Sequence, residues 1–240
     1  MKNKKNERRG KFIVFEGLDG SGTTTQSKLL GQYLEKQNWP VLNTSEPTQG
    51  PMGLILRLLL TNRLIFNGRP SEQGNQELEI LSNSSIALLF AADRLDHIQH
   101  TILPKIQDGV IVICERYYFS SYAYQMGKSS KNLKWLTTIN SRCIQPDLTI
   151  YLNTSLAVCN KRRFTNRWYQ DLYEKPEILE QVAKNYDYVV QNMKKKMPVE
   201  IVDGTPNEKV VFEKIIHIIQ NHFPEMFPNN PTLFTDNAQS

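Results

Sequence analysis

The chain has 240 residues, of which 40% are hydrophobic and 22% are charged, and these values argue against a disordered chain, a collagen or a coiled coil. The formal net charge of +5 arises entirely before Phe12, so the body of the chain is neutral and we expect no nucleic-acid partner. The longest apolar runs are far shorter than the roughly 20 residues of a membrane-spanning helix, and no signal-peptide pattern is present, so we expect no membrane association and a cytoplasmic location.

Short apolar runs alternate along the chain with longer stretches in which apolar residues recur every three or four positions. In chain order, the pattern predicts a strand at residues 11–17, a helix at 24–38, a strand at 41–44, helices at 53–61 and 77–107, a strand at 110–114, an interrupted helix at 120–144, a strand at 148–152, helices at 155–163 and 176–196, a strand at 199–202 and a helix at 207–221. Strands that are apolar on both faces and separated by helices indicate a parallel sheet that helices cover on both sides. The predicted fold class is therefore α/β, of the doubly wound type.

The segments outside these elements suggest one domain with two tails. No linker long enough to separate two domains is present, so residues 11–222 are predicted to form a single domain. We interpret residues 1–10 as a disordered basic tail, with a weak contact to a polyanion as the alternative, and residues 223–240 as a loosely held C-terminal tail. Residues 61–75 are predicted to be a polar loop. The three cysteines lack C-x-x-C spacing, which indicates reduced thiols rather than a disulfide framework or a zinc site.

A glycine-rich segment, GLDGSGTTT, lies between the first predicted strand and the first predicted helix. Gly17 and Gly22 have the spacing of a G-x-x-x-x-G-K-S/T loop, whose backbone N–H groups cradle phosphate oxygens at the start of a helix. The hydroxyl of Thr24 stands where such a loop ligates Mg²⁺. The predicted ATP phosphate-binding residues are Gly17, Leu18, Asp19, Gly20, Ser21, Gly22, Thr23, Thr24 and Thr25. The alternative is a glycine-rich turn that binds no ligand.

The loop departs from this pattern at one position. Thr23 stands where the lysine that bridges the terminal phosphates is normally found. A hydrogen bond to a charged group contributes roughly 1.5 to 3 kcal/mol. Either another cation compensates for the missing lysine, or the chemistry is slower.

Further blocks of sequence accompany the loop. They are residues 15–22 with Thr24, Thr25 and Gln26, Glu46 and Pro47 with Arg57, residues 88–94 (LLFAADR) with His97, residues 115–117 (ERY) with residues 120–125, and residues 146–149 (PDLT). In this order they resemble the thymidylate kinases of bacteria, P-loop enzymes of the nucleoside monophosphate kinase group, over roughly residues 11–220. The resemblance implies a P-loop NTPase-type three-layer sandwich with a five-stranded parallel sheet. It also implies phosphoryl transfer from ATP, with Mg²⁺, to dTMP to give dTDP, and a homodimer.

Three arginines, Arg57, Arg94 and Arg116, are candidates for binding the acceptor phosphate. A planar guanidinium matches two phosphate oxygens at once. The resemblance implies that Arg57 and Arg94 contact the monophosphate and that Arg116 lies beside it, where it takes part in catalysis. The alternative for each is a solvated surface charge.

Two carboxylates are candidates at the same place. Glu115 follows the apolar run VIVIC, so it projects from the carboxyl end of a buried strand, where open α/β sheets bind ligands. The family usually has aspartate here; glutamate is long enough to hold a magnesium-bound water or to orient Arg116, and the alternative is an ion pair with Arg116 alone. The resemblance implies that Asp19 accepts a hydrogen bond from the sugar 3′-hydroxyl, with a turn-forming carboxylate as the alternative.

Aromatic and polar residues at helical spacing are candidates for holding the nucleoside. Phe90 lies one helical turn before Arg94, so one helix face could stack a pyrimidine and grip its phosphate, unless Phe90 packs in the core. Ser121, Tyr124 and Gln125 fall at i, i+3 and i+4 and share a face. The resemblance implies that Tyr124 lies under the sugar and excludes a 2′-hydroxyl.

A basic and aromatic segment, about residues 160–174, falls where the family has its flexible lid. The resemblance implies that the lid supplies the catalytic arginine when the P-loop contains none. Arg162, Arg163 and Arg167 are therefore the candidates to replace the missing lysine, and Lys28 is the runner-up. The alternative for the cluster is a solvated helix end.

Four departures from the family pattern leave other functions open. They are Thr23 for lysine, Ser45 for the arginine before Glu-Pro, Glu115 for aspartate, and Asn153 for the aspartate after the fourth strand. The alternatives are a kinase for another deoxynucleotide or nucleoside, and a nucleotide-binding pseudoenzyme that regulates a partner. The acceptor-side residues form a complete set, which favours the kinase that acts on dTMP.

Overall fold

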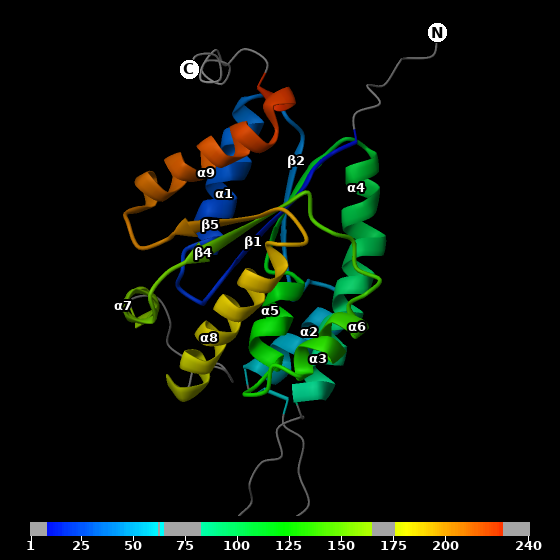
Figure 1. Ribbon diagram of the computed structural model, residues 1–240. Coiled ribbons are helices and arrows are strands. Elements are labelled where there is room, and N and C mark those ends of the chain that lie inside the picture. Colours follow the sequence, from blue (N-terminus) through cyan, green and yellow to red (C-terminus); the bar gives the residue numbers. More distant parts are fainter. Residues whose placement is uncertain (1–8, 62, 65–82, 165–175, 228–240) are drawn as a thin grey trace, which may run out of the picture.

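The computed structural model describes residues 9–61, 63–64, 83–164 and 176–227, and these contain a five-stranded sheet (Figure 1). The strands are β1 (Phe12–Gly17), β2 (Val41–Ser45), β3 (Ile111–Glu115), β4 (Leu148–Asn153) and β5 (Val199–Asp203). Their order is β2-β3-β1-β4-β5, and every neighbouring pair is parallel. The predicted five-stranded parallel sheet is confirmed, and each strand boundary lies within one residue of its prediction.

Helices connect the strands and cover the sheet. They are α1 (Thr23–Lys36), α2 (Pro51–Leu60), α3 (Asn83–His97), α4 (Leu103–Gln107), α5 (Tyr118–Gln125), α6 (Asn132–Ile139), α7 (Leu156–Phe164), α8 (Pro176–Met193) and α9 (Glu208–His222). A π-helical turn (Ile98–Ile102) joins α3 to α4, and a short 3-10 turn (Pro224–Met226) follows α9.

The central strand β1 is buried on both faces. Because successive side chains of a strand point to opposite sides, Ile13 and Phe15 pack in the cluster that contains residues of α1 and α9. Phe12 and Val14 pack in the cluster that contains residues of α5 and α8. The layers are visible in Figure 1, and they confirm the prediction of helices on both faces. An unbroken apolar run therefore specifies a strand at the centre of the sheet.

The long helix predicted over residues 77–107 is divided. Residues 77–82 lie outside the described part of the chain, and α3 and α4 are separated by the π-helical turn. In that turn the N–H of Leu103 donates to the carbonyl oxygen of Ile98, five residues back. Pro104, which follows directly, has no N–H to offer a regular helical hydrogen bond. Apolar periodicity alone does not reveal this change of helix type.

The C-terminal tail predicted over residues 223–240 begins too early. Phe223 and Met226 are buried in the cluster beside α9, and Glu225 forms an ion pair of 2.7 Å with Lys11. The packed chain extends to Phe227, because two apolar side chains outweigh the turn-forming prolines around them. Residues 228–240, residues 1–8 of the predicted basic tail and most of the predicted polar loop lie outside the described residues.

Among the described helices, none combines the length and the apolar character that crossing a membrane requires.

Candidate active site

A cleft of about 830 Å³ lies at the carboxyl ends of β1, β2 and β3, the edge at which open α/β sheets bind ligands. Most of the site residues predicted from the sequence line it. They are Asp19, Gly20, Gly22, Thr23, Thr24, Thr25, Arg57, Phe90, Arg94, Glu115, Arg116, Ser121, Tyr124, Gln125, Arg162 and Arg163. Gly17, Leu18 and Ser21 belong to the same loop but do not line the cleft, and Arg167 lies outside the described residues. The fold thus brings the predicted donor and acceptor residues into one cavity.

The loop between β1 and α1 has the backbone of an anion-binding turn. Gly20 and Gly22 have positive φ angles of 84° and 105°, which residues with a side chain rarely adopt. Gly22 precedes the first residue of α1, and no side chain caps this end of the helix. The first N–H groups of a helix have no partner within it, and the helix dipole favours negative charge there. The start of α1 can therefore receive the phosphate oxygens of a nucleotide.

Two hydroxyl groups at the start of α1 share one carboxylate oxygen. Thr23 donates to Oε1 of Glu115 at 2.7 Å, and Thr24 donates to the same atom at 2.5 Å. Glu115 is the last residue of β3, so the sheet fixes its position relative to the loop. Hydroxyl and carboxylate oxygens are the hard ligands that Mg²⁺ prefers, and the donor set therefore fits this ion.

Arg116 connects the phosphate-binding loop to the acceptor side of the cleft. Its Nη2 donates to Oδ1 of Asp19 at 3.0 Å, and Oη of Tyr124 donates to Oδ2 of the same carboxylate at 3.1 Å. The guanidinium also lies over the ring of Tyr124, 5.5 Å from its centre. Arg116 has a positive φ angle of 65°, a strained backbone conformation that is typical of functional sites.

Glu16 lies beneath Arg116 and is completely buried. Its Oε1 accepts hydrogen bonds from the backbone N–H groups of Tyr117 (2.9 Å) and Ser120 (3.2 Å), so it caps the start of α5. Its Oε2 accepts from the hydroxyls of Ser120 (2.6 Å) and Tyr186 (3.2 Å). Both hydroxyls in turn accept from Nη1 of Arg116, at 3.2 and 3.4 Å. One carboxylate therefore holds both a helix and the arginine.

Burial raises the pKa of Glu16 to about 7, although hydrogen bonds from Ser120 and the charge of Arg116 oppose the rise. The carboxyl group therefore changes its charge in the physiological range. The sequence interpretation did not identify Glu16. Its signal is a carboxylate inside an otherwise apolar strand, since a charge buried at such a position requires partners.

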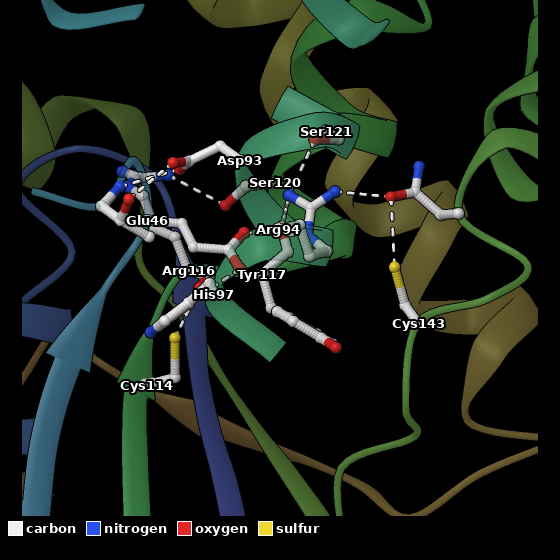
Figure 2. A network of polar contacts seen from close by, with 12 residues as sticks. Glu46, Asp93, Arg94, His97, Cys114, Arg116, Tyr117, Ser120, Ser121 and Cys143 are labelled. Atoms are coloured by element: carbon white, nitrogen blue, oxygen red, sulfur yellow. Dashed lines mark hydrogen bonds and ion pairs between the residues drawn. The ribbon is translucent and has the colours of Figure 1, made fainter. Parts of the chain in front are cut away.

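Arg94 is held in a buried network (Figure 2). Its side chain is 1% exposed, and its Nε donates to Oε2 of Glu46 at 2.8 Å in an ion pair. The terminal nitrogens donate to Oδ1 of Asn140 (2.5 Å), the carbonyl oxygen of Tyr117 (3.1 Å) and Oγ of Ser121 (3.0 Å). These bonds use four of the five N–H groups of a guanidinium. Arg94 therefore lines the cleft with most of its N–H groups already engaged in hydrogen bonds within the protein.

Glu46 is also in contact with His97, whose Nδ1 lies 3.2 Å from Oε1 of the carboxylate. The other ring nitrogen lies 2.8 Å from Oγ1 of Thr44. Ligand atoms of Glu46, His97 and Cys114 all lie within 4.8 Å of one another, as a metal site would require. Because Glu46 is already paired with Arg94 and both nitrogens of His97 have partners, we interpret the group as a hydrogen-bonding network that supports the cleft.

The remaining acceptor residues come from α2 and α3. Arg57 donates from Nη1 to the carbonyl oxygens of Pro47 (3.2 Å) and Thr48, and in the described part of the chain all its hydrogen bonds come from that nitrogen. The buried carboxylate of Asp93 accepts from the N–H (2.8 Å) and hydroxyl (2.6 Å) of Thr48, which fixes the loop after β2. Phe90 is half-buried and lines the cleft one turn before Arg94.

Comparisons with known proteins agree with this geometry. A family model described as thymidylate kinase matches residues 15–215. The chain is 36% identical over 214 residues to a probable thymidylate kinase of Pyrococcus abyssi, an alignment that covers 89% of this chain and 97% of that protein. It is 33% identical over 216 residues to a probable thymidylate kinase of Staphylothermus marinus, covering 90% and 98% of the two chains. A probable thymidylate kinase of Methanococcus aeolicus is 38% identical over 180 residues, with 75% and 79% covered.

Proposed function

Because the chain belongs to the thymidylate kinase family, we propose that it transfers the terminal phosphoryl group of ATP to dTMP and releases ADP and dTDP. An oxygen of the dTMP phosphate forms a bond to the γ-phosphorus of ATP. The bond from that phosphorus to the bridging oxygen breaks, and its electron pair stays on the β-phosphate of ADP. The attacking oxygen is already negatively charged, so no side chain has to remove a proton.

The start of α1 binds the triphosphate of ATP in this proposal. Thr23, Thr24 and Thr25 follow Gly22 in the first turn of α1, where N–H groups have no partner within the helix and the helix dipole favours an anion. Thr24 and Glu115 would hold Mg²⁺, which when bound neutralises charge on the phosphates. We assign the metal to these two residues because Oγ1 of Thr24 and Oε1 of Glu115 are already in hydrogen-bond contact.

Arg57 and Arg116 bind the phosphate of dTMP. Both line the cleft, and their guanidinium groups can each match two phosphate oxygens. Arg94 lines the same cleft, but its bonds to Glu46, Asn140 and Ser121 leave it little capacity for the phosphate. We therefore assign Arg94 to the support of the acceptor pocket, in place of the direct phosphate contact expected from the resemblance.

Phe90 and Tyr124 hold the nucleoside. Phe90 offers an aromatic face at the wall of the cleft, which can stack on a pyrimidine. Tyr124 donates a hydrogen bond to Asp19, and the family resemblance implies that this carboxylate also accepts from the sugar 3′-hydroxyl. The resemblance also implies that the ring of Tyr124 lies under the sugar, where it would exclude a 2′-hydroxyl and so favour deoxyribose. Ser121 and Gln125 complete the same wall.

The observation that carries the proposal is the contact of Arg116 with Asp19. It joins the loop between β1 and α1 to the segment between β3 and α5, and this supports a proposal in which the donor and acceptor phosphates meet head to head in one cleft. The test is a steady-state assay of the purified chain with ATP and Mg²⁺ against dTMP, dUMP, dCMP and thymidine. We expect the highest kcat/KM with dTMP. Tight binding of ATP without turnover of any acceptor would instead indicate a pseudoenzyme.

We also propose that the chain forms a homodimer. Three large apolar side chains on α2, α3 and α6 are exposed, namely Leu54 (53%), Leu88 (51%) and Trp135 (38%). α3 packs against both α2 and α6, so these side chains belong to one helical layer that a second copy could cover. Light scattering during size-exclusion chromatography would give the mass of a dimer, and a monomer at micromolar concentration would contradict the proposal. A cytoplasmic location and the absence of a nucleic-acid partner remain expectations from the sequence.

A further inference from the structure

Tyr186 approaches the acceptor side of the cleft from behind. It belongs to α8, it is completely buried, and it does not line the cleft itself. Its side chain nevertheless contacts both Arg116 and Tyr124, the residues proposed to meet the phosphate and the sugar of dTMP. A residue in this place acts on a substrate through its neighbours.

The hydroxyl of Tyr186 holds one nitrogen of Arg116. Nη1 of Arg116 donates to Oη of Tyr186 at 3.4 Å and to Oγ of Ser120 at 3.2 Å. These two oxygens lie 2.8 Å apart, and the hydroxyl of Tyr186 also donates to Oε2 of Glu16 at 3.2 Å. The two acceptors of Nη1 are uncharged, so they fix the direction of the guanidinium without themselves placing a negative charge beside a bound phosphate.

Arg116 needs this support because its backbone is strained. Its φ angle of 65° lies in the left-handed region, which residues with a side chain rarely adopt. Such a conformation persists only where the surrounding structure holds it in place. Asp19 accepts from Nη2 at 3.0 Å, and the hydroxyls of Ser120 and Tyr186 accept from Nη1. The guanidinium is therefore fixed at both of its terminal nitrogens.

The ring of Tyr186 supports the ring of Tyr124. The two rings pack edge to face, with their centres 6.1 Å apart and their planes at 88°. The ring of Tyr186 is also stacked on that of Tyr151 in β4, with 5.5 Å between the centres and 22° between the planes. Since β4 pairs with β1, the strand that leads into the phosphate-binding loop, the sheet fixes the support behind Tyr124.

The residue before Tyr186 fixes α8 to α5, the helix that contains Tyr124. The side-chain nitrogen of the buried Asn185 donates to the carbonyl oxygens of Ala123 (2.8 Å) and Gly127 (3.0 Å). The two helices also pack against each other. Tyr186 therefore has a fixed position relative to Tyr124, as a residue that sets the geometry of the cleft must have.

We infer that Tyr186 is a positioning residue for the acceptor, with two separate functions. Its hydroxyl directs Arg116 toward the phosphate of dTMP, and its ring holds Tyr124 beside the sugar. The inference rests on the proposed phosphoryl transfer and on the proposed binding of dTMP in the cleft. Removal of the hydroxyl alone should impair recognition of the phosphate, whereas removal of the ring should also impair the choice between deoxyribose and ribose.

The test compares Y186F and Y186L with the wild type at saturating ATP and Mg²⁺. The acceptors are dTMP and its counterpart with a 2′-hydroxyl, ribothymidine 5′-monophosphate. We expect Y186F to raise the KM for dTMP by about fivefold or more, because Nη1 of Arg116 loses one of its acceptors. The preference for dTMP, given by the ratio of kcat/KM between the two acceptors, should stay as in the wild type. Y186L should raise the KM for dTMP as well and lower this preference by about fivefold or more. The KM for ATP should change by less than about twofold in both variants.

Tyr118→Phe is the matched control. Tyr118 is also buried, but its hydroxyl donates to Sδ of Met197 (3.3 Å), so this variant should keep the wild-type kinetics. Y186F retains the shape of the side chain and should melt near the wild type. If Y186L does not fold, Y186M takes its place, because the flexible side chain of methionine fills more of the space.

The two functions are overturned by different results. A KM for dTMP in Y186F within about twofold of the wild type would refute the function of the hydroxyl. So would an equal rise in the KM for ATP, since it would indicate a general structural effect. An unchanged preference in Y186L or Y186M, or a wild type that uses both acceptors equally well, would refute the function of the ring. A wild type that phosphorylates neither acceptor would refute the proposed function itself.

Discussion

Thr23 donates a hydrogen bond of 2.7 Å to Oε1 of Glu115, the carboxylate that also accepts from Thr24. A lysine at this position would place a formal charge beside the terminal phosphates. The hydroxyl gives no charge, but it holds Glu115 against the start of α1. The loop thus keeps its contact with the end of β3 although it contains no lysine.

Restoring lysine in the loop should bring little benefit if, as the resemblance implies, an arginine of residues 160–174 replaces it. We expect Thr23→Lys to change kcat for dTMP by less than about threefold, because the arginine would already supply the charge that the lysine adds. Steady-state kinetics at saturating ATP measure this, with Thr23→Val as the control for loss of the hydrogen bond to Glu115. A gain of about 30-fold or more would show that nothing compensates for the missing lysine.

Replacing Glu115 should weaken the binding of Mg²⁺. Glu115→Gln keeps the size of the side chain and removes the negative oxygen that faces Thr24. We expect the Mg²⁺ concentration for half-maximal activity to rise by about tenfold, since a carboxylate is a much better ligand for this ion than an amide. Titration with MgCl₂ at fixed ATP measures it. An unchanged midpoint would remove Glu115 from the metal site.

Replacing Arg94 and replacing Arg57 should have different effects on the stability of the protein and on its use of dTMP. Arg94→Ala leaves the buried carboxylate of Glu46 without its ion-pair partner, so we expect unfolding free energy to fall by about 3–5 kcal/mol and use of dTMP to weaken more than about tenfold. Arg57→Ala should cost about 1 kcal/mol or less and mainly raise the KM for dTMP. Urea unfolding and steady-state kinetics supply both values. Equal losses of stability would contradict the supporting role of Arg94.

Glu16 should make the use of dTMP depend on pH near neutrality. Because the pKa of Glu16 is raised to about 7, the carboxylate is charged above pH 7 and neutral below it. Arg116, Ser120 and Tyr186 face this group. Protonation of Glu16 weakens the hydrogen bonds that it accepts from Ser120 and Tyr186, and these two hydroxyls hold Arg116. We expect the KM for dTMP to rise as the pH falls from 8 to 6, and Glu16→Gln to flatten this change while the KM for ATP stays the same.

The phosphate of dTMP also titrates near pH 6, so the measured quantity is the ratio of KM between Glu16→Gln and the wild type at each pH. A constant ratio would contradict the role of Glu16. The sign for stability is opposite to that of an ordinary ion-paired carboxylate. The pKa of Glu16 is raised from 4.5 in the unfolded chain to about 7 in the folded one, so its contribution to stability is present below pH 4.5 and lost as the pH rises through 7. Glu16→Gln should remove this decrease in the free energy of unfolding between pH 4.5 and 7.

The sheet could be predicted because local patterns decide it. Runs such as residues 12–15 are apolar without interruption, and only a strand covered on both faces buries every such side chain. The glycines of the loop, the arginines and Tyr124 could be selected by spacing and resemblance. The cleft brings them together, because parallel strands end at the same edge.

The networks around the site could not be predicted, because they join residues far apart in the chain. Glu16 and Tyr117 are 101 positions apart, and their contact depends on the order of the strands. Arg162 and Arg163 are adjacent and chemically identical, and only the folded chain shows that Arg162 donates to the carbonyl oxygen of Gly204 whereas Arg163 donates to Asn160. In the same way, the burial of Met226 depends on the sheet face beneath it.

The central claim is that this chain moves a phosphoryl group from ATP to dTMP despite having no lysine in its loop. Its most direct test is to incubate the purified wild-type protein with ATP, Mg²⁺ and dTMP and to quantify the nucleotides by chromatography over time. The account predicts that ADP and dTDP appear in equal amounts. Formation of ADP without dTDP, or no consumption of ATP by protein that binds it, would contradict the account.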